Sequence, residues 1–309
     1  MAALVAAMLA GDGSSQQQPA FRSGVDLVSF AVTVADRKGG LVTSLDASDF
    51  EVYEDGQKQT VTHFSTGGTE GAPGRFPGEL HLGVLLDISG SMEADLNLAR
   101  TAAIKFLNTL TEASDFTVVE FDTQVRMTRY GQHDFPRLVE RLRSRRSEGY
   151  TALYDAIGVY LDGASSDSGR KILVLYSDGA DNSSSITMDE VRDLLRASDV
   201  TVYAIGFLEH LPSASRFQIE SLLRQMAEIT GGQLFIPSSM KNLEASYEKV
   251  RAEIAAQYSL GYTSTNARTD GTWRNVEIKL ARPERQALRV RTRSGYFAPY
   301  RQPPGLAGH

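Results

Sequence analysis

Between residues 82 and 257, strand-like and helix-like segments alternate along the chain, and this alternation sets the fold. The strand-like segments are short and largely apolar, as expected for strands buried on both faces; they lie at residues 82–86, 116–121, 171–176, 200–207 and 233–236. Helical patterns, with apolar residues three and four positions apart, include residues 92–110 and 242–257. Residues 125–130 add a sixth strand after a short turn, which indicates a hairpin at one edge. The pattern predicts an α/β unit with a six-stranded, mostly parallel, doubly wound sheet.

Pure β patterns flank this unit on both sides. Val28, Phe30 and Val32 alternate with small residues before it, and Val276 and Ile278 alternate with charged residues after it. Such period-two patterns are typical of half-buried strands. Because neither segment has enough strands to be stable by itself, we expect the two to pair into one β-sandwich, with the α/β unit inserted between them.

Composition divides the chain further. We expect a leader or disordered segment at residues 1–20, sandwich strands at 21–66, a Gly- and Pro-rich linker at 67–78, the α/β unit at 79–257, sandwich strands at 258–298 and a tail at 299–309. The leader opens with an apolar run that resembles part of a secretory signal without its basic start. It favours a secreted, periplasmic or cell-envelope protein, with a disordered tail as the alternative. No later stretch has the length of apolar residues that a membrane span needs.

Hydroxyl and carboxylate side chains follow two of the buried strands and precede one helix. Asp87, Ser89 and Ser91 stand in HLGVLLDISGSM, Thr151 stands in EGYTALYDAI, and Asp178 ends the strand in LVLYSDGAD. The carboxyl ends of parallel strands share one edge of a sheet, and α/β proteins bind ligands there. If the strands that carry Asp87 and Asp178 are neighbours, the three loops converge, and their oxygen donors suit a hard cation such as Mg²⁺, with Mn²⁺ or Ca²⁺ as alternatives.

Simpler roles remain open for these residues. The first loop could merely end a strand and cap a helix, and Thr151 could act as a helix N-cap. Asp181 and Asn182 lie close to Asp178 in the sequence, and we interpret them as turn residues rather than as supports of a metal site.

Several other kinds of site are excluded or disfavoured. The chain has no cysteine, its five histidines lack ligand spacing, and it contains no G-x-S-x-G or G-x-x-x-x-G-K-[ST] string. A formal net charge of -6 argues against nucleic acid as a partner. Arg289, Arg291 and Arg293 alternate along a strand pattern; we interpret them as a solvated sheet face, with an anionic partner as the alternative.

The five oxygen donors in these contexts resemble the metal-ion-dependent adhesion site of the von Willebrand factor type A domain. The order of elements over residues 79–257 is similar to that domain, and SDFEVYEDG, YSLGY and RSGYF resemble a bacterial group described as VWFA-related proteins. The resemblance implies that Ser89, Ser91 and Thr151 contact the cation through their hydroxyls. It also implies that Asp87 and Asp178 hold the cation directly or through water.

This donor set suggests a function. Three neutral donors and two acids leave a divalent cation incompletely neutralised when an acid is held through water, so a further carboxylate is attracted to it. By resemblance, that carboxylate is a Glu or Asp of a partner protein, and the last helix, at residues 242–257, can shift when it binds. We therefore expect a non-catalytic adhesion or assembly module. A metal-assisted hydrolase, which lacks a candidate general base here, and a scaffold with a purely structural metal are the alternatives.

Overall fold

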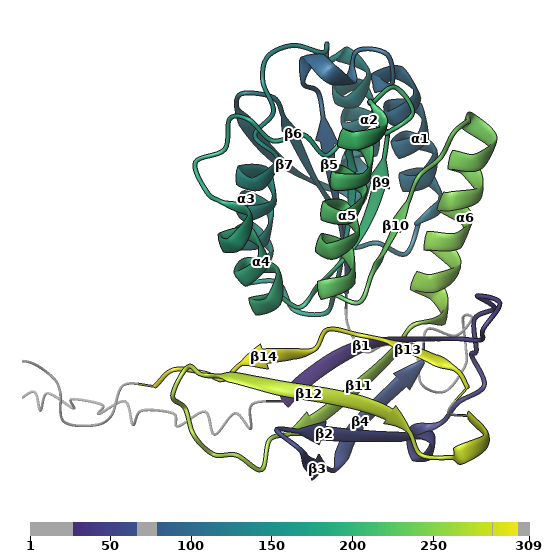
Figure 1. Cartoon of the computed structure of the whole chain (residues 1–309), viewed down its shortest axis with the longest axis vertical. Helices are drawn as coiled ribbons and strands as arrows, with labels where there is room; N and C mark the ends of the chain where they lie inside the picture. Colours follow the sequence, from purple (N-terminus) through teal and green to yellow (C-terminus); the bar gives the residue numbers. More distant parts are fainter. Residues whose placement is uncertain (1–26, 67–78, 286, 302–309) are drawn as a thin grey trace, which may run out of the picture.

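The protein's structure, a computed structural model, describes residues 27–66, 79–285 and 287–301. The expected leader at residues 1–20 and linker at 67–78 lie outside the described residues, as does the tail beyond residue 301. The domain boundaries given above stay predictions. The described chain forms a helix-covered sheet that stands on a β-sandwich (Figure 1).

The α/β unit is built on a six-stranded sheet. Its strands, in spatial order, are β10 (Gln233–Phe235), β9 (Val200–Gly206), β8 (Arg170–Ser177), β5 (Leu80–Asp87), β6 (Asp115–Phe121) and β7 (Val125–Gly131). All neighbours are parallel except β6 and β7, which form the predicted antiparallel hairpin at the edge. This confirms the expected mostly parallel, doubly wound architecture.

Helices cover both faces of this sheet. One face packs against α1 (Leu96–Thr109), α2 (Phe135–Ser144) and α6 (Met240–Ala256), and the other packs against α3 (Leu153–Ala164), α4 (Met188–Ala197) and α5 (Ser213–Ile229). In β5, Val84 and Leu86 join the first core and Leu85 joins the second. The strand is therefore apolar at consecutive positions because both of its faces are buried. No helix among the described residues is long and apolar enough to cross a membrane.

The sandwich combines strands from both ends of the described chain. One sheet orders β13 (Arg289–Arg291), β1 (Leu27–Ala35), β11 (Tyr258–Thr263) and β4 (Val61–Thr66); the other orders β14 (Gly295–Phe297), β12 (Trp273–Leu280), β2 (Phe50–Glu54) and β3 (Gln57–Gln59). Val32 from one end and Val276 and Ile278 from the other share its core. The expected insertion of the α/β unit into one sandwich is confirmed.

The arginines after residue 288 do not form the solvated sheet face that we expected. Arg291 forms an ion pair of 2.6 Å with Glu253 at the end of α6. Arg293 donates to the carbonyl oxygens of Ser198 and Ser29, at 3.0 and 2.8 Å. Of Arg289, Arg291 and Arg293, only Arg289 is exposed. The interpretation was wrong because β13 ends at Arg291 and because the α/β unit packs on this part of the sandwich.

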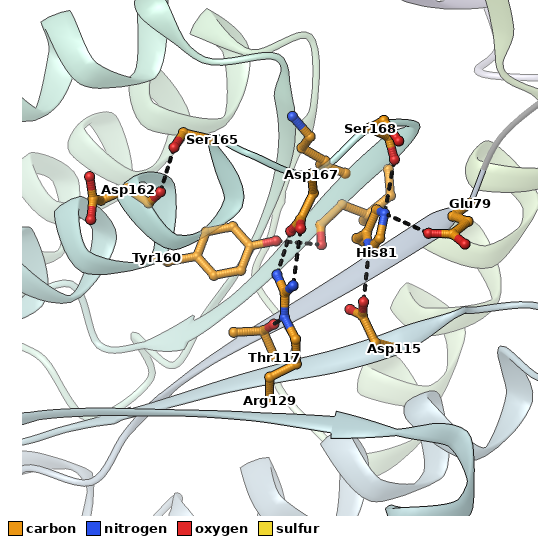
Figure 2. Close-up of polar contacts among 12 residues, drawn as sticks. Glu79, His81, Asp115, Thr117, Arg129, Tyr160, Asp162, Ser165, Asp167 and Ser168 are labelled. Carbon is orange, nitrogen blue, oxygen red and sulfur yellow. Dashed lines mark hydrogen bonds and ion pairs between the residues drawn. The ribbon is translucent and has the colours of Figure 1, made fainter. Parts of the chain in front are cut away.

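A polar network closes the amino edge of the six-stranded sheet (Figure 2). His81 Nδ1 lies 2.8 Å from Asp115 Oδ2, and His81 Nε2 lies 2.9 Å from the carbonyl oxygen of Ser168. Nearby, Arg129 pairs with Asp167. These contacts tie the starts of β5 and β6 to the loop before β8.

Candidate metal centre

The candidate ligands lie on loops at the carboxyl edge of the sheet. Strands β5 and β8 are adjacent and parallel, with Leu86 opposite Tyr176, so Asp87, the last residue of β5, and Asp178, the first residue after β8, lie at the same edge of the sheet. Both aspartates are fully buried, Ser89 and Thr151 are nearly so, and Ser91 is exposed. Strand pairing thus places the first and third loops side by side.

The first loop folds around the carboxylate of Asp87. Asp87 Oδ1 accepts a hydrogen bond from the backbone N–H of Ser89 at 3.0 Å, and the hydroxyls of Ser89 and Ser91 lie 3.1 Å apart. A 3₁₀ turn, η2 (Gly90–Met92), follows, and α1 begins only at Leu96. Neither element has a side-chain hydrogen bond from its N-cap within the described structure. The capping role considered for this loop is therefore not observed.

Thr151 is also not a helix cap. Helix α3 begins at Leu153 with Ala152 at its N-cap. The backbone N–H of Thr151 instead donates to Asn182 Oδ1 at 2.8 Å, and its carbonyl oxygen accepts from the N–H groups of Asn182 and Ser183, both at 3.0 Å. None of the hydrogen bonds described for Thr151 involves its hydroxyl, which leaves this oxygen available as a ligand.

Backbone contacts hold the second loop against the first. The N–H of Gly90 donates to the carbonyl oxygen of Gly149 at 3.1 Å, and the N–H of Glu148 donates to that of Ile88 at 2.9 Å. Gly149 has a φ of 77°, and a Cβ there would lie 2.7 Å from Thr123 Oγ1. A glycine is therefore required at this turn, which brings Thr151 toward the loop of Ser89.

The electrostatics of the site fit a cation. Burial raises the pKa of Asp87 to about 7; hydrogen bonds from Ser177 and Ser89 oppose this effect, and the charge of Asp178 adds to it. Asp178 Oδ1 accepts from the N–H of Ala180 at 3.1 Å, whereas Asp178 Oδ2 is buried without a hydrogen-bond partner among the described residues. A buried carboxylate oxygen that lacks a partner is costly unless an ion satisfies it.

The donor set also indicates which kind of cation would fit. Within the residues that the structure describes, no group of three or more His, Cys, Asp or Glu side chains has the arrangement of a metal site. The candidate centre instead combines two carboxylates with neutral hydroxyls. Hydroxyl and carboxylate oxygens suit hard ions such as Mg²⁺, Mn²⁺ or Ca²⁺.

Two supporting roles were missed in the sequence. Ser177 Oγ donates to Asp87 Oδ2 at 2.6 Å and accepts from the N–H of Gly179 at 2.9 Å, so it links the first and third loops. Asn182 lies in a bend, as we expected of a turn residue, and its side chain also accepts from the N–H of Thr151, which we did not predict. The place of Ser177 between a buried strand and Asp178 was a usable signal, but no local pattern marks Asn182 as a partner of Thr151.

Comparison with known protein families identifies one match. The sequence model of the von Willebrand factor type A domain matches residues 81–249. No curated protein sequence matches the chain. Among solved structures, BatB from Bacteroides thetaiotaomicron is 15% identical with a TM-score of 0.45, over 57% of this chain and 98% of that chain.

Two further solved structures match over a larger share of this chain. A von Willebrand factor type A protein from Catenulispora acidiphila is 14% identical with a TM-score of 0.48, over 91% of this chain and 76% of that chain. The pilus adhesin SpaC from Lactobacillus rhamnosus GG is 10% identical with a TM-score of 0.48, over 85% of this chain and 49% of that chain.

Proposed function

Since the chain belongs to the von Willebrand factor type A domain family, we propose that it is a cation-dependent protein-binding module for adhesion or assembly. Mg²⁺, or Mn²⁺ or Ca²⁺ in its place, is held by the candidate ligands; these are Asp87, Ser89, Ser91, Thr151 and Asp178. An Asp or Glu side chain of a partner protein completes the coordination. The module is non-catalytic and acts outside the cytoplasm, in the periplasm, on the cell envelope or in the medium, as its signal-like leader suggests.

The observation that carries this proposal is the partnerless oxygen of Asp178. Asp178 Oδ2 is buried, and the second buried carboxylate, that of Asp87, is close enough for the two charges to interact. Two buried acids raise the free energy of the folded protein unless protons or a cation neutralise them. A divalent cation beside both acids removes this cost, and the hydroxyls of Ser89 and Ser91 supply further donors.

The partner's carboxylate has a reason to bind. The proposed protein ligands carry at most two negative charges, and three of the five are neutral, so the cation keeps an attraction for a further anion. Ser91 is the exposed ligand, whereas the other four are buried. The partner therefore approaches from the side of Ser91.

Calorimetric titration with Mg²⁺ and a thermal melt with and without chelator test the metal. Wild-type protein is expected to bind Mg²⁺ and to melt at a higher temperature with it, whereas Asp178→Asn loses both effects. Asp193→Asn is the matched control, because Asp193 is exposed on α4, where it faces Arg196 at 3.7 Å. Equal melting temperatures with Mg²⁺ and with chelator would refute the metal site.

A second experiment tests the partner chemistry. Proteins retained from a native extract by the immobilised chain are compared with Mg²⁺ and with chelator, and each candidate is retested after its acidic contact residue is changed to the amide. Retention that needs both Mg²⁺ and the acid supports the proposal. If the partner is retained equally with Mg²⁺ and with chelator, while Mg²⁺ still raises the melting temperature, the result favours a scaffold with a purely structural metal. Hydrolysis of a phosphoester or peptide that Asp87→Ala abolishes favours the hydrolase.

A further inference from the structure

The segment after Asp178 is built onto the start of helix α3. Asp181 Oδ2 accepts a hydrogen bond from the N–H of Tyr154 at 3.0 Å. In the other direction, the carboxylate of Asp155 accepts from the N–H of Ser185 at 2.9 and 3.0 Å. Helix α3 has no side-chain hydrogen bond from its own N-cap within the described residues, so the segment supplies an acceptor that the helix start needs. Residues 181–185 are therefore anchored to α3.

Two residues of this segment contact Thr151: Ser183 through its backbone N–H alone, and Asn182 through its backbone and its side chain. The side-chain oxygen of Asn182 accepts from the N–H of Thr151, and its own N–H donates to the carbonyl oxygen of Thr151. Both polar backbone atoms of Thr151 are thus bound to one residue of the third loop. Thr151 is buried, whereas Asn182 is exposed. Asn182, which is not itself a proposed ligand, therefore holds the backbone of Thr151 and with it the Cα to which the side chain is attached.

We propose that Asn182 is a positioning residue that places the hydroxyl of Thr151 for cation binding, an inference that rests on the function proposed above. A side chain can coordinate a metal ion only when its donor atom is correctly placed, and hydrogen bonds from surrounding groups help to hold it in that place. Without the side chain of Asn182, the buried N–H of Thr151 loses its acceptor and the loop relaxes to find another. Because Asn182 also follows Asp178 by four positions, it couples two of the three ligand loops.

Three variants test this role. Asn182→Ala removes the acceptor, Asn182→Asp keeps an oxygen at the same place, and Asn242→Ala is the matched control, since Asn242 donates its side-chain N–H to Ser238 at the start of α6. Mg²⁺ affinity is measured by calorimetry, and hydrogen exchange of the Thr151 amide is measured by NMR in chelator. Circular dichroism checks that each variant is folded.

We expect Asn182→Ala to weaken Mg²⁺ binding at least about tenfold and to speed exchange of the Thr151 amide. Asn182→Asp is expected to restore both properties, and Asn242→Ala to change neither. If wild-type protein binds Mg²⁺ and Asn182→Ala binds it equally well, the positioning role is refuted and the proposed function stands. If wild-type protein binds no Mg²⁺, the proposed function fails first. Unchanged exchange of the Thr151 amide in Asn182→Ala also overturns the inference, whatever the metal affinity.

Discussion

The raised pKa of Asp87 predicts an unusual dependence of stability on pH in metal-free protein. Burial moves this pKa from 3.8 to about 7 in the folded state. Between these two values the folded protein binds more protons than the unfolded chain, so the free energy of unfolding falls as pH rises through this window. The sign is opposite to that of a carboxyl stabilised by an ion pair, whose contribution is lost as pH falls.

The magnitude follows from the same two values. At roughly 1.4 kcal/mol per pH unit, a carboxyl whose pKa rises from 3.8 to about 7 destabilises the folded state by up to about 4 kcal/mol above neutral pH. Asp87→Asn carries no charge at any pH and keeps the shape of the side chain. The difference in stability between this variant and wild-type protein therefore reports the titration of Asp87 together with its coupling to Asp178.

Urea unfolding at about pH 4 and about pH 8, in chelator and in saturating Mg²⁺, measures this difference. In chelator, the free energy of unfolding of Asp87→Asn, relative to that of wild-type protein, is expected to rise by about 3–4 kcal/mol from the lower to the higher pH. In Mg²⁺, that gain shrinks or reverses, because the cation stabilises the carboxylate of Asp87 and binds the variant poorly. A stability difference that stays constant with pH in chelator would refute the buried, proton-binding state of Asp87. A pH-dependent difference that Mg²⁺ leaves unchanged would refute cation binding beside it.

Gly83→Ala is expected to lower the free energy of unfolding by about 1–3 kcal/mol, because a Cβ at this position of β5 would lie 2.2 Å from the ring of the buried Tyr160. A melting temperature equal to that of wild-type protein would contradict this packing. Arg291→Ala is expected to cost about 1–3 kcal/mol, because it leaves the largely buried carboxylate of Glu253 without its ion pair. In urea unfolding, the exposed Arg289→Ala should change stability by less than about 0.5 kcal/mol, and equal effects of the two arginine variants would be evidence against the contact between β13 and α6.

Local patterns were sufficient to predict the strands of the six-stranded sheet and the fold class. The continuous apolar run in β5 reports burial of both strand faces, and the alternation around Val276 reports burial of one. Helix ends were less well predicted: the pattern at residues 92–110 suggested one helix, whereas η2 precedes α1, which begins at Leu96. Apolar spacing continues across that 3₁₀ turn because Met92 is buried in the same core as the helix.

The sequence by itself determined which apolar positions of the strands are buried and which chemical groups lie at the ends of the strands, including Asp87 and Asp178. Only the tertiary structure decided that β8 lies beside β5, that Asn182 holds Thr151, and that Arg291 meets Glu253. A periodic pattern of apolar residues indicates that one side of a helix or strand is buried, because buried positions take apolar side chains. The pattern does not indicate which element packs on that side, because strand order and contacts between loops depend on residues far apart in the chain.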